Sequence, residues 1–170
     1  MRVLLPVAPL ARPQGGRAWW PIDHGPRPSD RGRETPEGVV AARQRLVSLL
    51  EQLRRQGTIE PAETYLAGFS QGAMLAQDVA LEWNATVAGV VMLSGGPIDE
   101  ERWRRRLTSR APVRVFVSHG RSDRVLAFAA AQRWRQRLEV AGSDVTFAPF
   151  DGGHQIPRPV VTHLIRWLGG

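Results

Sequence analysis

The chain has 170 residues, enough for one domain with a sizeable core, and it has no cysteine, so disulfide bonds are excluded. Its formal net charge of +7 is carried by arginine alone, because the sequence contains no lysine. The arginines are spread over several expected helices, which favours solvated helix faces over a binding surface for nucleic acid. No apolar run reaches the length of a membrane span, and the apolar residues after Arg2 suit a strand better than a signal peptide. We therefore expect a cytoplasmic protein that binds no nucleic acid and has no stable membrane insertion.

The first 36 residues contain one strand pattern and one long loop pattern. Residues 3–7 are continuously apolar, which predicts a buried parallel strand. Residues 8–36 are crowded with Pro, Gly and Arg, and we expect them to form a long loop. Trp19 and Trp20 lie in the middle of this loop. Because two adjacent tryptophans are costly to leave in water, we expect them to cover the core or to line a pocket.

The rest of the chain alternates helical and strand patterns. Helices are expected at residues 35–57, starting with Thr35 as the cap, and at 73–83, 99–107, 127–140 and 160–168; strands are expected at 65–69, 87–93, 112–117 and 144–149. The strands are apolar on both faces. This combination predicts a single α/β domain over residues 1–170, with a mostly parallel sheet that is covered by helices on both faces.

The sequence GFSQG at residues 68–72 lies between an expected strand and an expected helix. This is the G-x-S-x-G pattern of a nucleophile elbow, and the tight turn is expected to require glycine at both Gly68 and Gly72. In this context the Oγ atom of Ser70 projects from the carboxyl end of the strand. The backbone N–H of Gln71 then lies at a helix N-terminus, where it can stabilise developing negative charge. The pattern alone is weak, since glycine turns before helices are common in α/β proteins.

Two further polar residues each follow a later expected strand: Asp123 and His154. In an open α/β sheet the active groups gather at the carboxyl ends of the strands. The chain order Ser, Asp, His is that of α/β-hydrolases. In this arrangement His154 would take the proton of Ser70 during attack, and Asp123 would orient the imidazole.

The other candidate residues have plainer interpretations. Asp151 lies close to His154 in sequence and is a rival to Asp123, which we prefer because its loop follows the expected layout of a triad. His119 is interpreted as a structural residue that orders the loop of Asp123. No spacing of His, Asp and Glu predicts a metal site.

Three motifs together resemble one family: GFSQGA at 68–73, HGRSD at 119–123 and GGHQI at 152–156. They are similar to the phospholipase/carboxylesterase family of α/β-hydrolases, which includes acyl-protein thioesterases. Residues 3–9 and the sequence GGRAWWPID at 15–23 also resemble the strand and loop that precede the elbow in that family. The likeness therefore covers nearly the whole chain.

The resemblance implies a serine hydrolase with Ser70, Asp123 and His154 as its triad. It also implies the Gln71 backbone N–H as one oxyanion donor and places Trp19 and Trp20 near the acyl or alcohol pocket. The implied reaction is hydrolysis of short- to medium-chain carboxylic esters, or thioesters, through an acyl-enzyme. The substrate would be a small-molecule ester, and no cofactor is implied.

One departure from the family concerns the oxyanion hole. Family members resemble each other in an earlier strand that ends in a His-Gly-x-Gly loop, and this loop supplies the second oxyanion donor. The given sequence lacks that segment. We therefore expect an N-terminally truncated α/β-hydrolase. Losing one donor typically lowers turnover about 100- to 1000-fold. The alternatives are therefore a catalytically impaired hydrolase-like fragment or, third in order, an arginine-rich binder of anionic surfaces. A homodimer through an exposed sheet edge is a further expectation.

Overall fold

The computed structural model describes residues 2–13, 15–21 and 35–170. In chain order its elements are β1 (Leu10–Ala11), β2 (Arg17–Ala18), α1 (Val39–Arg55), the short 3-10 helix η2 (Pro61–Glu63), β3 (Tyr65–Phe69), α2 (Gln71–Glu82), β4 (Gly89–Leu93), α3 (Glu100–Leu107), β5 (Arg114–Gly120), α4 (Phe128–Val140), β6 (Asp144–Phe150) and α5 (Arg158–Gly169).

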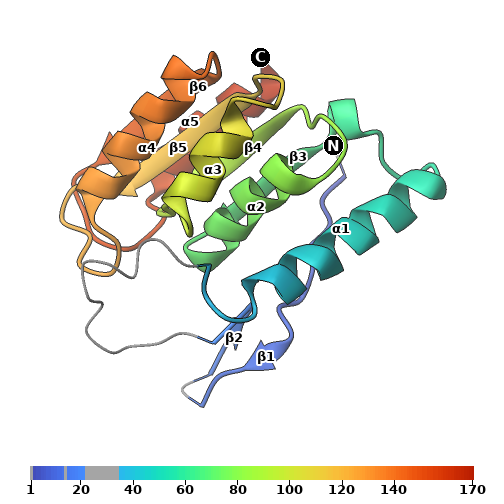
Figure 1. Ribbon diagram of the computed structural model, residues 1–170. Helices are drawn as coiled ribbons and strands as arrows, with labels where there is room; N and C mark the ends of the chain where they lie inside the picture. The colour runs from blue at the N-terminus through green and yellow to red at the C-terminus, as the bar shows by residue number, and fades with distance from the viewer. Residues whose placement is uncertain (1, 14, 22–34) are drawn as a thin grey trace.

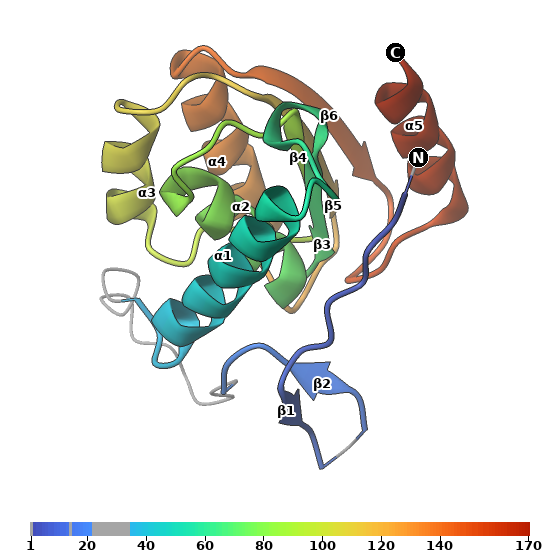
Figure 2. The same cartoon turned by 90° about the vertical axis from the view of Figure 1, so that its right-hand side faces the viewer.

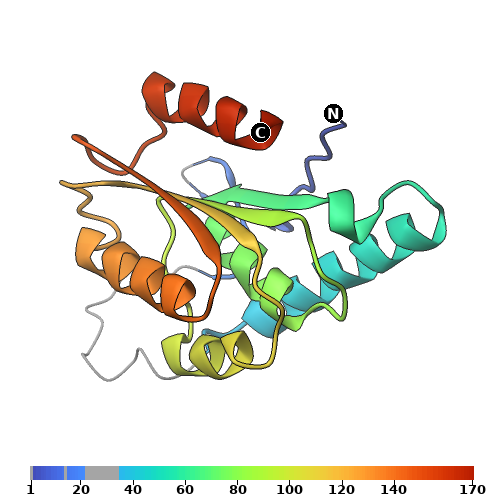
Figure 3. The same cartoon turned by 90° about the horizontal axis from the view of Figure 1, so that it is seen from above.

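The centre of the structure is a four-stranded sheet in the order β3-β4-β5-β6, and each neighbouring pair is parallel. Helices α1 to α4 lie on one side of this sheet and α5 lies on the other (Figures 1 and 3). Successive side chains of a strand point to opposite faces of the sheet, so the core has two clusters of buried apolar residues. Val90 and Met92 belong to the larger cluster, whereas Val91 packs with Phe116 and Trp167 under α5. The predicted α/β fold with a mostly parallel sheet is confirmed.

The helices on the larger side are held by apolar packing and by one buried charge. Trp83, Trp103 and Trp134 are among the largest fully buried side chains of this cluster. Asp78 on α2 is completely buried, accepts a hydrogen bond from Trp103 Nε1 at 2.6 Å, and pairs with arginines of α1 and α3. A buried carboxylate needs such partners, so Asp78 ties three helices together.

The predicted strand at residues 3–7 is wrong. No strand forms there, and Val3, Leu5 and Val7 are 63%, 85% and 72% exposed. The segment runs past the sheet on the side of α5 (Figures 2 and 3). Pro6 within the run has no N–H to donate to a neighbouring strand. In addition, the Arg17 guanidinium donates to the carbonyls of residues 8 and 9 and so holds this part of the chain to the β1–β2 hairpin.

The loop expected at residues 8–36 is only partly a loop. Strands β1 and β2 pair antiparallel, with Leu10 opposite Ala18, and Gly15 and Gly16 turn the chain between them at φ +85° and +79°. Left-handed backbone of this kind favours glycine. Residues 22–34 of the expected loop lie outside the described residues.

The start of α1 also differs from its prediction. The helix begins at Val39 after Gly38, which has φ +83°, and Thr35 does not cap it. The Thr35 hydroxyl instead donates to Asp99 Oδ2 at 2.9 Å, near the start of α3. The prediction that Thr35 caps this helix is therefore wrong, because its hydroxyl is used in a contact with a residue distant in sequence.

Strand β3 lies at one edge of the described sheet, with β4 as its neighbour. A homodimer through this edge stays a prediction. None of the helices in the described residues is long and apolar enough to cross a membrane.

Candidate active site

Ser70 sits at the turn between β3 and α2 with φ 53°, an uncommon backbone conformation for a residue other than glycine. Its N–H donates to the carbonyl of Leu93 at 2.8 Å, which fixes the turn to β4. A Cβ atom on Gly68 would lie 2.1 Å from the backbone carbon of Gly72, so only glycine fits at 68. The same requirement does not hold at Gly72, where the nearest atom to a Cβ is 4.0 Å away. The expectation that the turn needs both glycines for space is therefore wrong for Gly72.

Asp123 lies in the loop after β5 with its side chain fully buried. Its Oδ1 atom accepts hydrogen bonds from the backbone N–H groups of Val125, at 2.8 Å, and Leu126, at 2.9 Å. Burial alone would raise the pKa of Asp123, but hydrogen bonds from Leu126, His154 and Val125 lower it below its ordinary value. The carboxyl group is therefore held as an ion.

His154 lies in the loop after β6 and joins the other two side chains. Its Nδ1 atom is 2.7 Å from Asp123 Oδ2, and its Nε2 atom is 2.8 Å from Ser70 Oγ. Because a carboxylate only accepts, Nδ1 carries the proton and Nε2 is left to accept the one on Ser70. The ring of Phe69 packs beside the imidazole, with 4.8 Å between the centroids.

The two loops that carry Asp123 and His154 are fastened to each other by their backbones. The N–H of Ser122 donates to the Gly152 carbonyl at 3.0 Å. A Cβ atom on Gly120 would lie 2.2 Å from the Gly153 carbonyl oxygen, so the two loop segments lie too close together for any side chain at position 120. This close contact between the two loops brings the side chains of Asp123 and His154 within hydrogen-bond distance.

The rival residues lie elsewhere. The Asp151 side chain is 96% exposed and pairs with Arg121 at 3.4 Å. His119 is buried at the end of β5, where its Nε2–H donates to the Leu126 carbonyl at 2.9 Å and lies 3.3 Å from Asp123 Oδ2. It therefore supports the loop of Asp123.

The Gln71 side chain has a role that sequence reasoning missed. Its Oε1 atom accepts the Trp19 N–H at 2.7 Å, and its Nε2 atom donates to the Trp20 carbonyl at 3.0 Å. These two bonds clamp residues 19 and 20 against the N-terminus of α2, with Trp20 buried and Trp19 partly buried. The contact spans about fifty residues of chain, so no local sequence signal could have found it.

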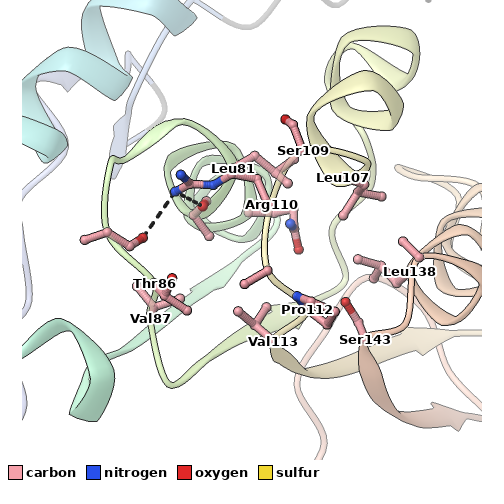
Figure 4. A pocket seen from close by; sticks show the side chains of 15 residues that line it. Leu81, Thr86, Val87, Leu107, Ser109, Arg110, Pro112, Val113, Leu138 and Ser143 are labelled. Carbon is pink, nitrogen blue, oxygen red and sulfur yellow. Dashed lines mark hydrogen bonds between the residues drawn. The ribbon is translucent and has the colours of Figure 1, made fainter.

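A cavity of about 80 Å³ lies away from these residues, at the opposite end of the sheet (Figure 4). Val87, Val113 and Ser143 line it, and each precedes the start of a strand. Ser70, Asp123 and His154 all follow strand ends. Arg110 fills one side of the cavity and donates to carbonyls at the end of α2. The cavity is therefore separate from the site.

The sequence pattern that defines the phospholipase/carboxylesterase family matches residues 5–169. The chain belongs to this family. The resemblance stated from the three motifs is thereby confirmed. Among the residues that the structure describes, Ser70 of the GFSQG turn and His154 in the loop after β6 lie within hydrogen-bond distance.

Relatives of this chain include a probable carboxylesterase SOBER1-like of Arabidopsis thaliana. It is 30% identical over 114 residues, which are 66% of this chain and 44% of the relative. Acyl-protein thioesterase 1 of Aspergillus fumigatus is 25% identical over 136 residues, 77% of this chain and 56% of the relative. The chain thus spans about half the length of these two relatives. The crystal structure of esterase PE8 superposes with a TM-score of 0.83 at 27% identity, covering 96% of this chain and 75% of that one.

Proposed function

We propose that this protein hydrolyses short- to medium-chain carboxylic esters or thioesters with Ser70 as the nucleophile. The observation that carries the proposal is the chain of two hydrogen bonds, 2.8 Å from Ser70 Oγ to His154 Nε2 and 2.7 Å from His154 Nδ1 to Asp123 Oδ2. A serine hydroxyl is a weak nucleophile at neutral pH and needs an adjacent base that is oriented by a third group. These three side chains supply that set.

The reaction follows from the geometry. Ser70 Oγ attacks the carbonyl carbon of the ester while its proton passes to His154 Nε2, and Asp123 stabilises the imidazolium that forms. The carbonyl oxygen becomes an oxyanion beside the N–H of Gln71, the first residue of α2. When the tetrahedral intermediate collapses, His154 returns the proton to the leaving alcohol or thiol. Water then cleaves the acyl-enzyme with His154 again acting as the base.

The surroundings of the triad support an acyl substrate. Phe69, Val125 and Ile156 stand one or two residues from the triad members along the chain, and all three are exposed hydrophobic side chains. Apolar surface beside a nucleophile favours the alkyl part of an ester over a charged substrate. The names of the two relatives, one a probable carboxylesterase and one an acyl-protein thioesterase, agree with either an oxygen ester or a thioester.

The test is hydrolysis of p-nitrophenyl butyrate by the purified chain and by Ser70→Ala. We expect turnover by the parent, and a loss of at least about 1000-fold in kcat for the variant. Ser48→Ala, a change of the same kind at an exposed position on α1, is the matched control and should keep the parent's kcat. Equal turnover by the parent and Ser70→Ala would refute the proposal.

Labelling with a fluorophosphonate separates the active hydrolase from a catalytically impaired one. The probe loses fluoride as Ser70 Oγ bonds to its phosphorus, which needs the activated hydroxyl. We expect one label per chain in the parent and none in Ser70→Ala. A folded parent that resists the probe would favour the impaired alternative.

A further inference from the structure

Among the described residues, the oxyanion hole of the proposed hydrolase has one evident main-chain donor, the N–H of Gln71. In α/β-hydrolases a second N–H comes from a loop after an earlier strand. In the described sheet β3 is an edge strand, so this position beside the elbow is not occupied by a strand of that kind. Next to the elbow, the Gln71 side chain holds the segment after β2 against the N-terminus of α2.

The indole of Trp19 reaches the elbow from this segment. Its Nε1 atom lies 4.0 Å from the position that a Cβ on Gly72 would occupy. Outside the chain neighbours of Gly72 and the backbone of its own helix, no other atom of the described residues lies within that range. A Cβ in a helix is tilted toward the helix N-terminus, so this position faces the end of α2 that carries Ser70 and the Gln71 N–H. The Trp19 indole is therefore beside the first turn of α2, the helix that follows Ser70.

The Trp19 backbone is fixed independently of its side chain. The clamp uses the main-chain N–H of Trp19 and the main-chain carbonyl of Trp20, at 2.7 and 3.0 Å from the Gln71 amide. Preorganised donors stabilise a transition state most, because they need no rearrangement when charge develops. An indole N–H donates and cannot accept, so in this position it can serve only an acceptor such as a carbonyl oxygen.

We infer that the Trp19 Nε1–H is the second hydrogen-bond donor to the oxyanion, working together with the Gln71 backbone N–H. The inference rests on the proposed function and adds a catalytic residue to it. Because the oxyanion exists only in the transition state and the tetrahedral intermediate, the indole contributes to kcat and little to KM.

The kinetic test is Trp19→Phe, which removes the N–H and keeps an aromatic ring and the backbone clamp. With p-nitrophenyl butyrate we expect kcat to fall about 100-fold while KM changes less than about threefold, as for other single oxyanion donors. Trp134→Phe is the matched control, since this buried indole packs against Trp103 beside α3, and it should keep kcat. A Trp19→Phe variant within about threefold of the parent's kcat would overturn the inference.

A spectroscopic test detects the bond itself. In ¹H–¹⁵N spectra each of the six tryptophan indoles contributes one N–H signal, and the signal missing in Trp19→Phe is that of Trp19. Phosphonylation of Ser70 places a phosphoryl oxygen where the oxyanion would lie. We expect the Trp19 signal to move downfield on labelling while those of Trp103, Trp134 and Trp167 stay in place. An unmoved Trp19 signal would overturn the inference.

The two proposals fail in different ways. A parent that neither turns over the ester nor takes the label overturns both. A parent whose activity depends on Ser70 but not on the Trp19 N–H overturns the inference alone.

Discussion

Replacing Gly68 by alanine tests how tight the elbow is. The added methyl carbon would lie 2.1 Å from the backbone carbon of Gly72, 2.2 Å from its oxygen and 2.5 Å from the nitrogen of Ala73. All three are backbone atoms at the start of α2, and none can rotate away. The first turn of the helix must therefore move outward, and Ser70 moves with it.

The size of the effect follows from the depth of this overlap. Overpacking typically costs about 1–3 kcal/mol, and contacts with backbone place Gly68→Ala at the upper end, about 3 kcal/mol. For a chain of this length each kcal/mol lowers Tm by about 2–4 °C, so Tm should fall by about 6–12 °C. A displacement of about 1 Å at a nucleophile can also cost about 100-fold in turnover.

Gly72→Ala is the matched control, because it adds the same methyl group four residues away. The nearest atom is 4.0 Å from the new carbon, and Gly72 lies in the first turn of α2. Alanine in a helix is favoured over glycine by up to about 1 kcal/mol, so Tm should stay level or rise. Thermal unfolding followed by circular dichroism measures both variants. If Gly68→Ala melted within about 2 °C of the parent, or if Gly72→Ala were the worse of the two, the steric account of the elbow would be wrong.

Two further predictions concern carboxylates. Asp78→Ala should lower the free energy of unfolding by about 3–5 kcal/mol, because it removes the partner of the Arg43 charge and of the buried Trp103 indole N–H. A loss below about 1 kcal/mol in urea unfolding would contradict the role of Asp78 in joining three helices. The lowered pKa of Asp123 in the folded chain favours folding above the unfolded value of about 3.9, and this stabilisation disappears as the pH falls through the folded pKa. Asp123→Asn should therefore flatten the dependence of stability on pH below about 4, measured by urea unfolding from pH 6 to 3, whereas exposed Asp151→Asn should keep the parent's curve.

The strands of the sheet could be predicted from sequence because their signal is local. Strand β3 matches its expected range, and β4 and β6 differ from theirs by at most two residues, since unbroken apolar runs between glycine-rich or polar turns mark strands buried on both faces. The convergence of Ser70, Asp123 and His154 follows from the same pattern. These three residues lie in loops at the carboxyl ends of β3, β5 and β6, which belong to one parallel sheet. Loops at the same edge of a small sheet bring their side chains together.

The parts that could not be predicted depend on contacts between distant residues. The apolar run at residues 3–7 has the composition of a buried strand, but burial needs a neighbouring strand, and β3 does not pair with it. Asp78 stands on a helix face where an apolar side chain is expected, and only the fold shows the Arg43, Arg102 and Trp103 groups that make its burial stable. Hydrophobic periodicity carries no information about such partners.

The Gln71 clamp gives this residue two separable roles, one through its main chain and one through its side chain. Gln71→Ala keeps the backbone N–H at the oxyanion but frees residues 19 and 20, so it should lower kcat by loosening the position of the Trp19 indole. If the Gln71 side chain acts only by positioning the Trp19 indole, Trp19→Phe alone already removes its whole contribution to kcat. The double variant Trp19→Phe/Gln71→Ala will then turn over p-nitrophenyl butyrate as fast as Trp19→Phe alone. Independent, multiplicative losses would instead mean that the Gln71 amide serves the reaction by another route, and that the two hydrogen bonds to residues 19 and 20 are structural.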